Sequence, residues 1–190
     1  TENFTELDNR TLTSTIPKTF IVYATYKNFT SKEIEVKFLE TDESFTKRVL
    51  IEDYTGAWCV NCPTVSYAIE KLKEQTDKAV PVAIHRGSNS ASFDPFHYED
   101  ANALEDLVGV ANQYPTAKLN RLTNWNYPQH TQTNLNKAIA LTTGTPVRLG
   151  LAMNSTISGN SINLDVKVKF LENYSNLKLV VYVLENGLIY

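Results

Sequence analysis

Two cysteines, Cys59 and Cys62, carry the most specific chemical signal in the sequence. They are the only cysteines, and they stand three positions apart where a helical pattern begins. Two cysteines on the first turn of a helix lie close enough to form a disulfide, and the unpaired N–H groups there stabilise a thiolate. Such placement lowers the pKa of a thiol, so we expect a reactive dithiol. Cys59, nearer the helix start, would attack a partner, and Cys62 would resolve the mixed disulfide.

Two other uses of the cysteine pair remain open. The pair could form a static structural disulfide, or it could supply half of a metal site. A zinc site would need two more ligands, and His85, His97 and His130 show no zinc-finger spacing. Haem attachment is excluded because Pro63, rather than a histidine, follows Cys62. We therefore favour a redox pair that needs no cofactor and no metal.

The elements expected around the cysteines form a βαβ unit. Residues 49–54 indicate a strand, residues 55–57 a turn, and residues 59–75 carry apolar side chains at helical spacing. Residues 80–85 are an apolar run typical of a strand that is buried on both faces. Two further helices are expected, at 99–108 and between 129 and 141.

The regions on either side of this unit are rich in β patterns. Two runs, 20–23 and 34–38, predict a hairpin. Beyond Pro146 the apolar residues recur with a period of two, in runs at 147–153, 162–170 and 177–184. Asn186-Gly187 is a strong hairpin turn, so we expect the native chain to continue beyond Tyr190.

The stretch around the cysteines resembles the thioredoxin fold. It has a strand that ends in an acid, a tryptophan directly before the first cysteine, and a helix after the second. The resemblance implies that Asp53, six residues before Cys59, is a buried carboxylate that accepts the proton of Cys62. Glu52 points to the opposite face of the same strand, so we expect one of the two acids to be buried, and we favour Asp53.

A second part of this resemblance is the sequence Tyr114-Pro115-Thr116. Thioredoxin-like proteins place a cis proline before a strand, facing the two sulfurs. The resemblance implies a cis bond before Pro115 and substrate contacts from Tyr114 and Thr116. Trp58, on the turn before Cys59, is expected to pack against the same substrate.

A narrower resemblance, to the outer-membrane-protein-28-related family of Bacteroidetes envelopes, covers most of the chain. It rests on residues 55–59, 82–85, 114–117 and 120–121, and on the β tail ending near 184–185. These proteins are typically exported, often as lipoproteins, and join a thioredoxin-like core to a β domain. The resemblance implies a location in the periplasm or at the outer membrane. An export signal and any N-terminal lipid anchor would lie outside the given sequence.

Together these features predict an α/β fold with a thioredoxin-like βαβ core, a β-rich N-terminal segment and a C-terminal antiparallel β domain. We expect an irregular arm at 1–18, a thioredoxin-like domain with an N-terminal β extension at 19–145, and the β domain at 146–190. The predicted function is a cell-envelope thiol-disulfide oxidoreductase that acts on protein or peptide thiols and disulfides. The alternative is a non-catalytic interaction module on the same scaffold. Val60-Asn61 stands where thioredoxins usually have Gly-Pro between the two cysteines, so the reduction potential of the cysteine pair cannot be read from the motif.

Other polar and aromatic residues have less specific interpretations. His85 ends a buried strand at the edge where open α/β sheets bind ligands, but a hydrogen-bonded structural histidine is the favoured interpretation. The aromatic residues of 93–98 could cover the site or seal a long loop. Asp94 and Glu99 are interpreted as solvated acids without a chemical role.

Charge argues against a nucleic-acid-binding protein, and hydropathy argues against a membrane-spanning helix. The net charge is -3 and the basic residues are scattered among acids, so a nucleic-acid partner is not expected. No apolar run approaches the roughly 20 residues that span a bilayer.

Overall fold

The computed structural model describes residues 4–8, 11–14, 18–38, 45–87 and 93–189. The chain divides into two units, Thr1–Ser44 and Phe45–Tyr190.

The first unit is built from antiparallel hairpins. β1 (Phe4–Asp8) pairs with β2 (Thr11–Ser14), β3 (Lys18–Val22) with β6 (Ile34–Phe38), and β4 (Thr25–Tyr26) with β5 (Phe29–Thr30). The β3–β6 pair confirms the hairpin predicted from 20–23 and 34–38. The expectation of an irregular segment at 1–18 is wrong, because two strands lie within it. The polar composition of these residues gave no apolar strand pattern. The strands contain threonine, however, which is β-branched and favours an extended backbone.

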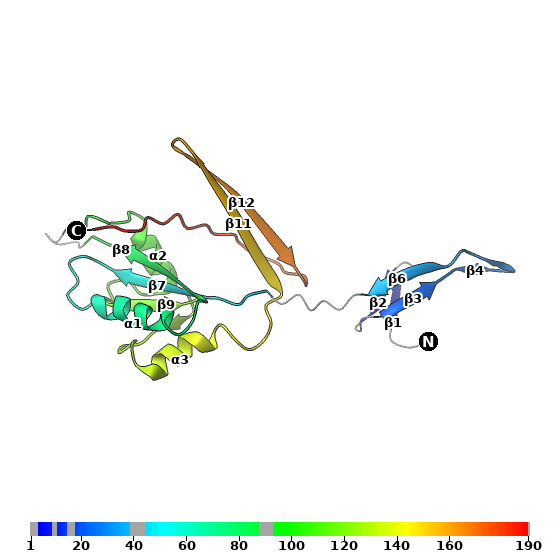
Figure 1. The fold of residues 1–190 in the computed structure, drawn as a ribbon, viewed down its shortest axis with the longest axis horizontal. Helices are drawn as coiled ribbons and strands as arrows, with labels where there is room; N and C mark the ends of the chain where they lie inside the picture. Colours follow the sequence, from blue (N-terminus) through cyan, green and yellow to red (C-terminus); the bar gives the residue numbers. More distant parts are fainter. Residues whose placement is uncertain (1–3, 9–10, 15–17, 39–44, 88–92, 190) are drawn as a thin grey trace. The chain divides into compact units, whose positions relative to one another are not determined.

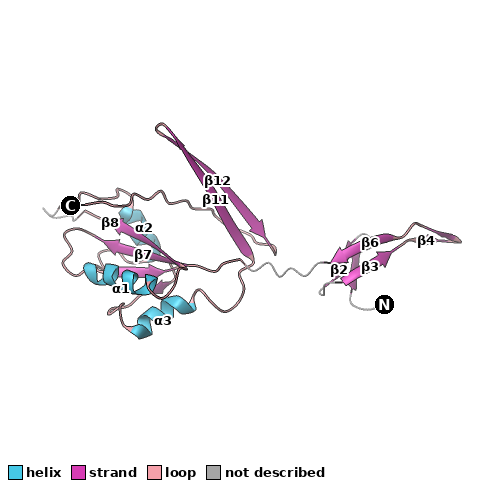
Figure 2. Cartoon of the chain, in the orientation of Figure 1, coloured by secondary structure: helices cyan, strands magenta, loops and turns pink. Residues whose placement is uncertain are grey.

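The second unit contains a four-stranded mixed sheet in the order β10-β9-β7-β8. β7 (Val49–Thr55) runs parallel to β8 (Ala79–His85) and antiparallel to β9 (Thr116–Leu119), which pairs with β10 (Thr123–Asn124). Helix α1 (Pro63–Lys73) connects β7 to β8 (Figures 1 and 2). The predicted βαβ unit and the α/β fold class are therefore confirmed.

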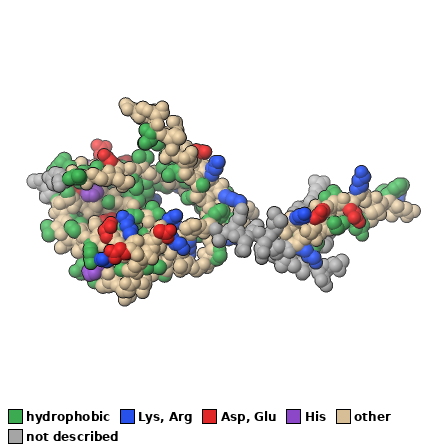
Figure 3. Space-filling view, viewed as in Figure 1, with side chains coloured by type: hydrophobic (Ala, Val, Ile, Leu, Met, Phe, Trp, Pro, Cys, Tyr) green, Lys and Arg blue, Asp and Glu red, His purple; other side chains and the backbone are tan. Residues whose placement is uncertain are grey.

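Two further helices complete the α/β part, α2 (Ala101–Val108) and α3 (Gln132–Ala140), close to where the pattern predicted them. Within the described residues, none of the helices is both long and apolar enough to cross a membrane. On the outer side of α1, Lys71 pairs with Glu74 and Lys73 with Glu70, and Figure 3 shows acidic and basic side chains intermixed there.

The sheet is covered on both faces, with α1 and α3 on one side and α2 on the other (Figure 1). Val49 and Ile51 of β7 pack with Val65 of α1 and with Leu135 of α3. Tyr54 lies on the opposite face of β7 and packs in a second cluster with Val82, Ile84 and Ala101. Because successive strand side chains alternate, Asp53 faces the α1 side and Glu52 the α2 side.

A long hairpin follows the core, formed by β11 (Leu149–Ser158) and β12 (Ser161–Phe170). Its register places one set of apolar side chains on a single face, and most of these are exposed: Leu151, Met153, Ile157, Ile162, Leu164, Val168 and Phe170. At the base of the hairpin, a Cβ added to Gly150 would lie 2.3 Å from ring atoms of Phe45. Glycine therefore allows the close approach of Phe45 to the strand.

The third β run predicted beyond Pro146, residues 177–184, is not a strand in the described structure. The segment that contains it passes beside β8, where Val181 to Glu185 and the residues Val82 to His85 line a cavity of about 560 Å³. The segment is attached through side chains instead of a hydrogen-bond ladder. An alternating pattern of apolar residues does not distinguish these two kinds of attachment.

Tyr182 provides this attachment by reaching Glu52 on the central strand. Its hydroxyl donates to Glu52 Oε1 at 2.6 Å, and Arg121 Nε donates to the same oxygen at 2.8 Å. Tyr54 donates to Glu52 Oε2 at 3.1 Å, and Arg121 also donates to the Tyr182 hydroxyl. The expectation that only one of Glu52 and Asp53 is buried is therefore wrong, since Glu52 is 0% and Asp53 2% exposed. Both faces of β7 are covered, and Glu52 has partners that permit its burial.

We predict that Tyr182→Phe lowers the free energy of unfolding by about 1–3 kcal/mol, because it removes a hydrogen bond to a buried carboxylate. Urea denaturation followed by circular dichroism measures the change. Tyr127→Phe is the matched control, since Tyr127 is 69% exposed. Equal stability of the two variants would show that the Tyr182 hydroxyl does not hold the segment.

Candidate functional site

Cys59 and Cys62 form a disulfide in the turn that joins β7 to α1. The two Cα atoms are 5.4 Å apart, and the S–S distance is 2.09 Å. The Cys59 N–H donates to Gly56 O at 2.9 Å, and the Cys62 N–H donates to Cys59 O at 3.2 Å. Cys62 is 2% exposed, whereas Cys59 is half-buried. Cys59 is therefore the more accessible of the two cysteines, and the order of attack stays a prediction.

The disulfide precedes α1 instead of lying on its first turn. The helix begins at Pro63 and ends at Lys73, so the predicted span of 59–75 was too long. Pro63 is suited to the first helical position because the N–H that it lacks would have no partner there. Cys62 is the N-cap residue and makes no side-chain cap hydrogen bond. The positive end of the helix dipole therefore faces the sulfurs without a competing acid in the first turn.

Asp53 is the buried acid on the α1 side of β7. Its Oδ1 has no hydrogen-bond partner among the described residues. Burial raises the pKa of this carboxyl to about 7. A carboxyl with such a pKa can both give and take a proton near neutrality.

Asp94 was interpreted as a solvated acid, and the structure corrects this. It is 1% exposed, and its Oδ2 accepts the Ala57 N–H at 2.7 Å and lies 2.9 Å from His85 Nδ1. Its Oδ1 accepts the Phe96 N–H at 2.9 Å. Burial would raise the pKa of Asp94, but these hydrogen bonds outweigh it and hold the pKa below its usual value. Asp94 thus fixes the turn that leads to the disulfide.

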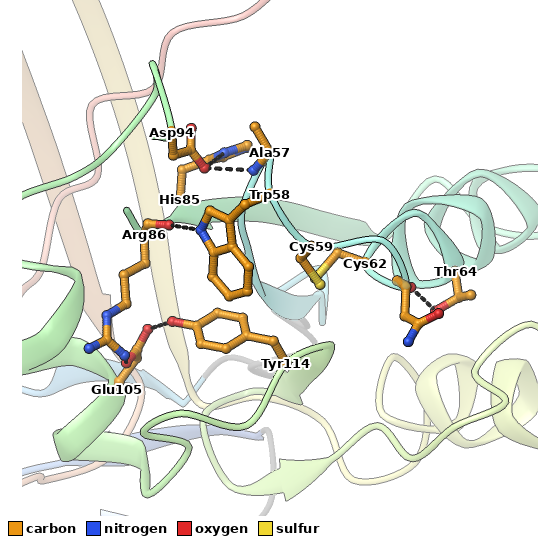
Figure 4. Close-up of a disulfide and its surroundings, with 11 residues drawn as sticks. Ala57, Trp58, Cys59, Cys62, Thr64, His85, Arg86, Asp94, Glu105 and Tyr114 are labelled. Carbon is orange, nitrogen blue, oxygen red and sulfur yellow. Dashed lines mark hydrogen bonds and ion pairs between the residues drawn. A yellow bond between two sulfur atoms is a disulfide. The ribbon is translucent and has the colours of Figure 1, made fainter. Parts of the chain in front are cut away.

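Aromatic side chains flank the disulfide (Figure 4). The peptide bond before Pro115 is cis, as the resemblance implied. The rings of Trp58 and Tyr114 meet edge to face with centroids 5.1 Å apart. Trp58 Nε1 donates to Arg86 O at 2.6 Å. The residues before Cys59 and before Pro115 are thereby brought together.

The other predicted contact residues lie on the sheet. Thr116 is the first residue of β9 and pairs with Tyr54 of β7. His85 ends β8, pairs with Asp94, and stacks edge to face on Phe96 at 5.4 Å. These contacts fit the structural interpretation of His85 and a sealing role for Phe96. Substrate contacts by His85 and Thr116 stay predictions.

Sequence reasoning missed two residues behind the aromatic pair, Arg86 and Glu105. Glu105 is 1% exposed, and its Oε2 accepts Arg86 Nη1 at 2.9 Å. A signal was present, because Glu105 falls on the apolar face of its helix with Ala101, Leu104 and Val108, at spacings of four, one and three. In the described parts of the chain, no group of three or more histidine, cysteine or acidic side chains could hold a metal ion.

Residues 101–190 match the family described as Outer membrane protein Omp28. The matched part begins at α2 and includes the cis proline, the β11–β12 hairpin and the segment with Tyr182. It supports an outer-membrane-associated protein and confirms the expected location in the cell envelope.

Two solved structures are similar to part of the chain. HBP35 of Porphyromonas gingivalis is 19% identical, with a TM-score of 0.45, over 60% of this chain and 38% of its own. Protein AGR_C_4864 of Agrobacterium tumefaciens is 16% identical, with a TM-score of 0.46, over 64% of this chain and 56% of its own. The chain spans less than two thirds of either protein, and similarity this low supports no inference about activity. None of the curated proteins matches the chain.

We predict that Asp53→Asn changes how stability depends on pH. The pKa of the Asp53 carboxyl is about 7 in the folded protein, against its ordinary value of 3.8, so its protonation stabilises the fold in full below the lower value. This contribution is lost as pH rises through 7. Between pH 5 and pH 8 the wild type should therefore lose on the order of 2 kcal/mol relative to the variant.

Urea denaturation of the oxidised proteins at both pH values measures this difference. Asp165→Asn, on exposed β12, is the control and should follow the wild type. Parallel pH dependence in the wild type and Asp53→Asn would contradict a raised pKa of Asp53.

Proposed function

We propose that the protein is a thioredoxin-like thiol-disulfide oxidoreductase of the cell envelope, with Cys59 and Cys62 as its redox couple. The observation that carries the proposal is the placement of the disulfide. Cys59 is half-buried and Cys62 is buried, and both stand at the positive end of α1, which packs on the side of β7 that carries Asp53. A bridge needed only for stability requires neither the accessible sulfur nor the buried acid.

The oxidised pair would react with a dithiol in two steps. A partner thiolate attacks Cys59 Sγ, the Cys59–Cys62 bond breaks, and Cys62 leaves as a thiolate that takes a proton from Asp53. A second partner thiol then loses its proton to the solvent, from which Asp53 regains one, and the resulting thiolate attacks the partner's sulfur in the mixed disulfide. Cys59 leaves as a thiolate stabilised by the start of α1. The partner becomes a disulfide, and its two electrons reduce the Cys59–Cys62 pair. The reverse sequence reduces a partner disulfide.

The family match, taken by itself, favours a second function better than the first. The matching family is named as an outer membrane protein, and the match includes the β11–β12 hairpin. It does not include the disulfide, because it begins at residue 101. The hairpin presents an exposed apolar face with Leu151, Met153 and Ile157 on one strand. In this second candidate, the protein is a non-catalytic interaction module that uses the hairpin, and the disulfide is structural.

We predict that Cys62→Ser traps partners through Cys59. Removal of the resolving thiol leaves the first mixed disulfide without an internal attacker, so a stable adduct should form with a peptide disulfide. Mass spectrometry of the intact adduct detects it, and a reductant should release it.

Cys59→Ser is the matched control. It keeps one cysteine, but that cysteine is 2% exposed, so we expect little or no adduct. Equal adduct formation by the two variants, or none by either, would favour the interaction module over the oxidoreductase.

A further inference from the structure

Glu105 lies on α2, yet its carboxylate connects the two segments that flank the disulfide. Its Oε2 accepts Arg86 Nη1 at 2.9 Å, and its Oε1 accepts the Tyr114 hydroxyl. Arg86 is held by a further hydrogen bond, from Nη1 to Asn112 Oδ1 at 3.0 Å. Both members of the ion pair are buried, with side chains 11% and 1% exposed.

The contacts continue from this pair to the site. The carbonyl oxygen of Arg86 accepts Trp58 Nε1 at 2.6 Å, and Trp58 directly precedes Cys59. Tyr114 directly precedes the cis proline, and its ring meets that of Trp58 (Figure 4). Gly56 gives the indole its room, since an added Cβ would lie 2.5 Å from Trp58 Nε1.

This arrangement is more specific than stability requires. A buried ion pair gains little over apolar side chains of the same volume, because removing two charges from water offsets their attraction. What the ion pair adds is a fixed orientation of the aromatic side chains beside it. Glu105 Oε1 accepts the Tyr114 hydroxyl directly, and Oε2 accepts the guanidinium of Arg86, whose backbone carbonyl oxygen accepts Trp58 Nε1. One carboxylate therefore links two aromatic residues that are 56 positions apart in the chain (58 and 114).

We propose that Glu105 is a positioning residue that holds Trp58, through Arg86, and Tyr114 as a fixed aromatic wall beside Cys59. The contribution of Glu105 to thiol-disulfide exchange rests on the proposed function. The wall offers apolar and aromatic surface to a polypeptide partner that approaches the half-buried Cys59. A small dithiol such as dithiothreitol reaches the sulfur without using the wall.

The test compares two reductants on Glu105→Gln. A glutamine keeps the size but loses the charge, and an NH2 donor takes the place of one of the two oxygens that accept from Arg86 and Tyr114. We expect the rate constant for reduction by a dithiol peptide to fall about tenfold, as for one lost charged hydrogen bond. Reduction by dithiothreitol should change less than about twofold by the same reasoning, since no wall contact is lost.

Two further variants keep the test decisive. Tyr114→Phe removes only the hydroxyl, so it should also slow the peptide reaction, and the double variant should be no slower than Glu105→Gln, because both changes break one network. Glu70→Gln, on the exposed side of α1, is the control and should behave as wild type. Equal loss with both reductants, or wild-type behaviour of Tyr114→Phe, would overturn the positioning role.

A second readout does not depend on redox activity. Of the two tryptophans, Trp125 is 2% exposed, so the fluorescence accessible to acrylamide reports Trp58. Glu105→Gln should increase this quenching, and Glu70→Gln should not. If the wild type fails to react with peptides while the quenching still changes, the proposed function fails and the positioning stands. Unchanged quenching in a folded Glu105→Gln protein would overturn the positioning itself.

Discussion

Strand β7 is buried on both faces, and the second unit is arranged around that constraint. A strand in this position cannot present a polar side chain to water, so each one must be paired or neutralised. Glu52 is paired, because Arg121, Tyr54 and Tyr182 all donate to it. Asp53 Oδ1 has no hydrogen-bond partner among the described residues, and burial raises the pKa of Asp53 to about 7. The same strand thus carries a structural anchor on one side and a buried acid with a raised pKa on the other.

The disulfide site uses residues from both faces of the sheet, the α1 face and the α2 face. In the proposed reaction, Asp53 and the start of α1 would supply the proton and the positive potential from one face. Buried charged residues near the other face, Arg86 and Glu105, hold the aromatic side chains at the surface. Asp94 fixes the turn between them through Ala57. The proposed chemistry would therefore depend on α2 and its flanking loops as much as on the cysteines.

Local sequence patterns predicted much of this fold, because periodicity is a property of neighbouring residues. The βαβ unit, the β3–β6 hairpin, the three helices among the described residues and the cis bond before Pro115 all follow from short stretches or from resemblance. The burial of Glu52 and Asp94 did not follow. Glu52 depends on Tyr182, 130 positions away, and Asp94 on Ala57, 37 positions away. No local pattern reveals which distant donor satisfies a buried acid.

The reduction potential of the Cys59–Cys62 pair tests the central claim most directly. The protein is equilibrated with glutathione buffers of known potential, and free thiols are counted by alkylation and mass spectrometry. A reversible couple should titrate between roughly -270 and -120 mV, the range of dithiol oxidoreductases. A bridge that stays oxidised below about -300 mV, where structural disulfides lie, would contradict the account.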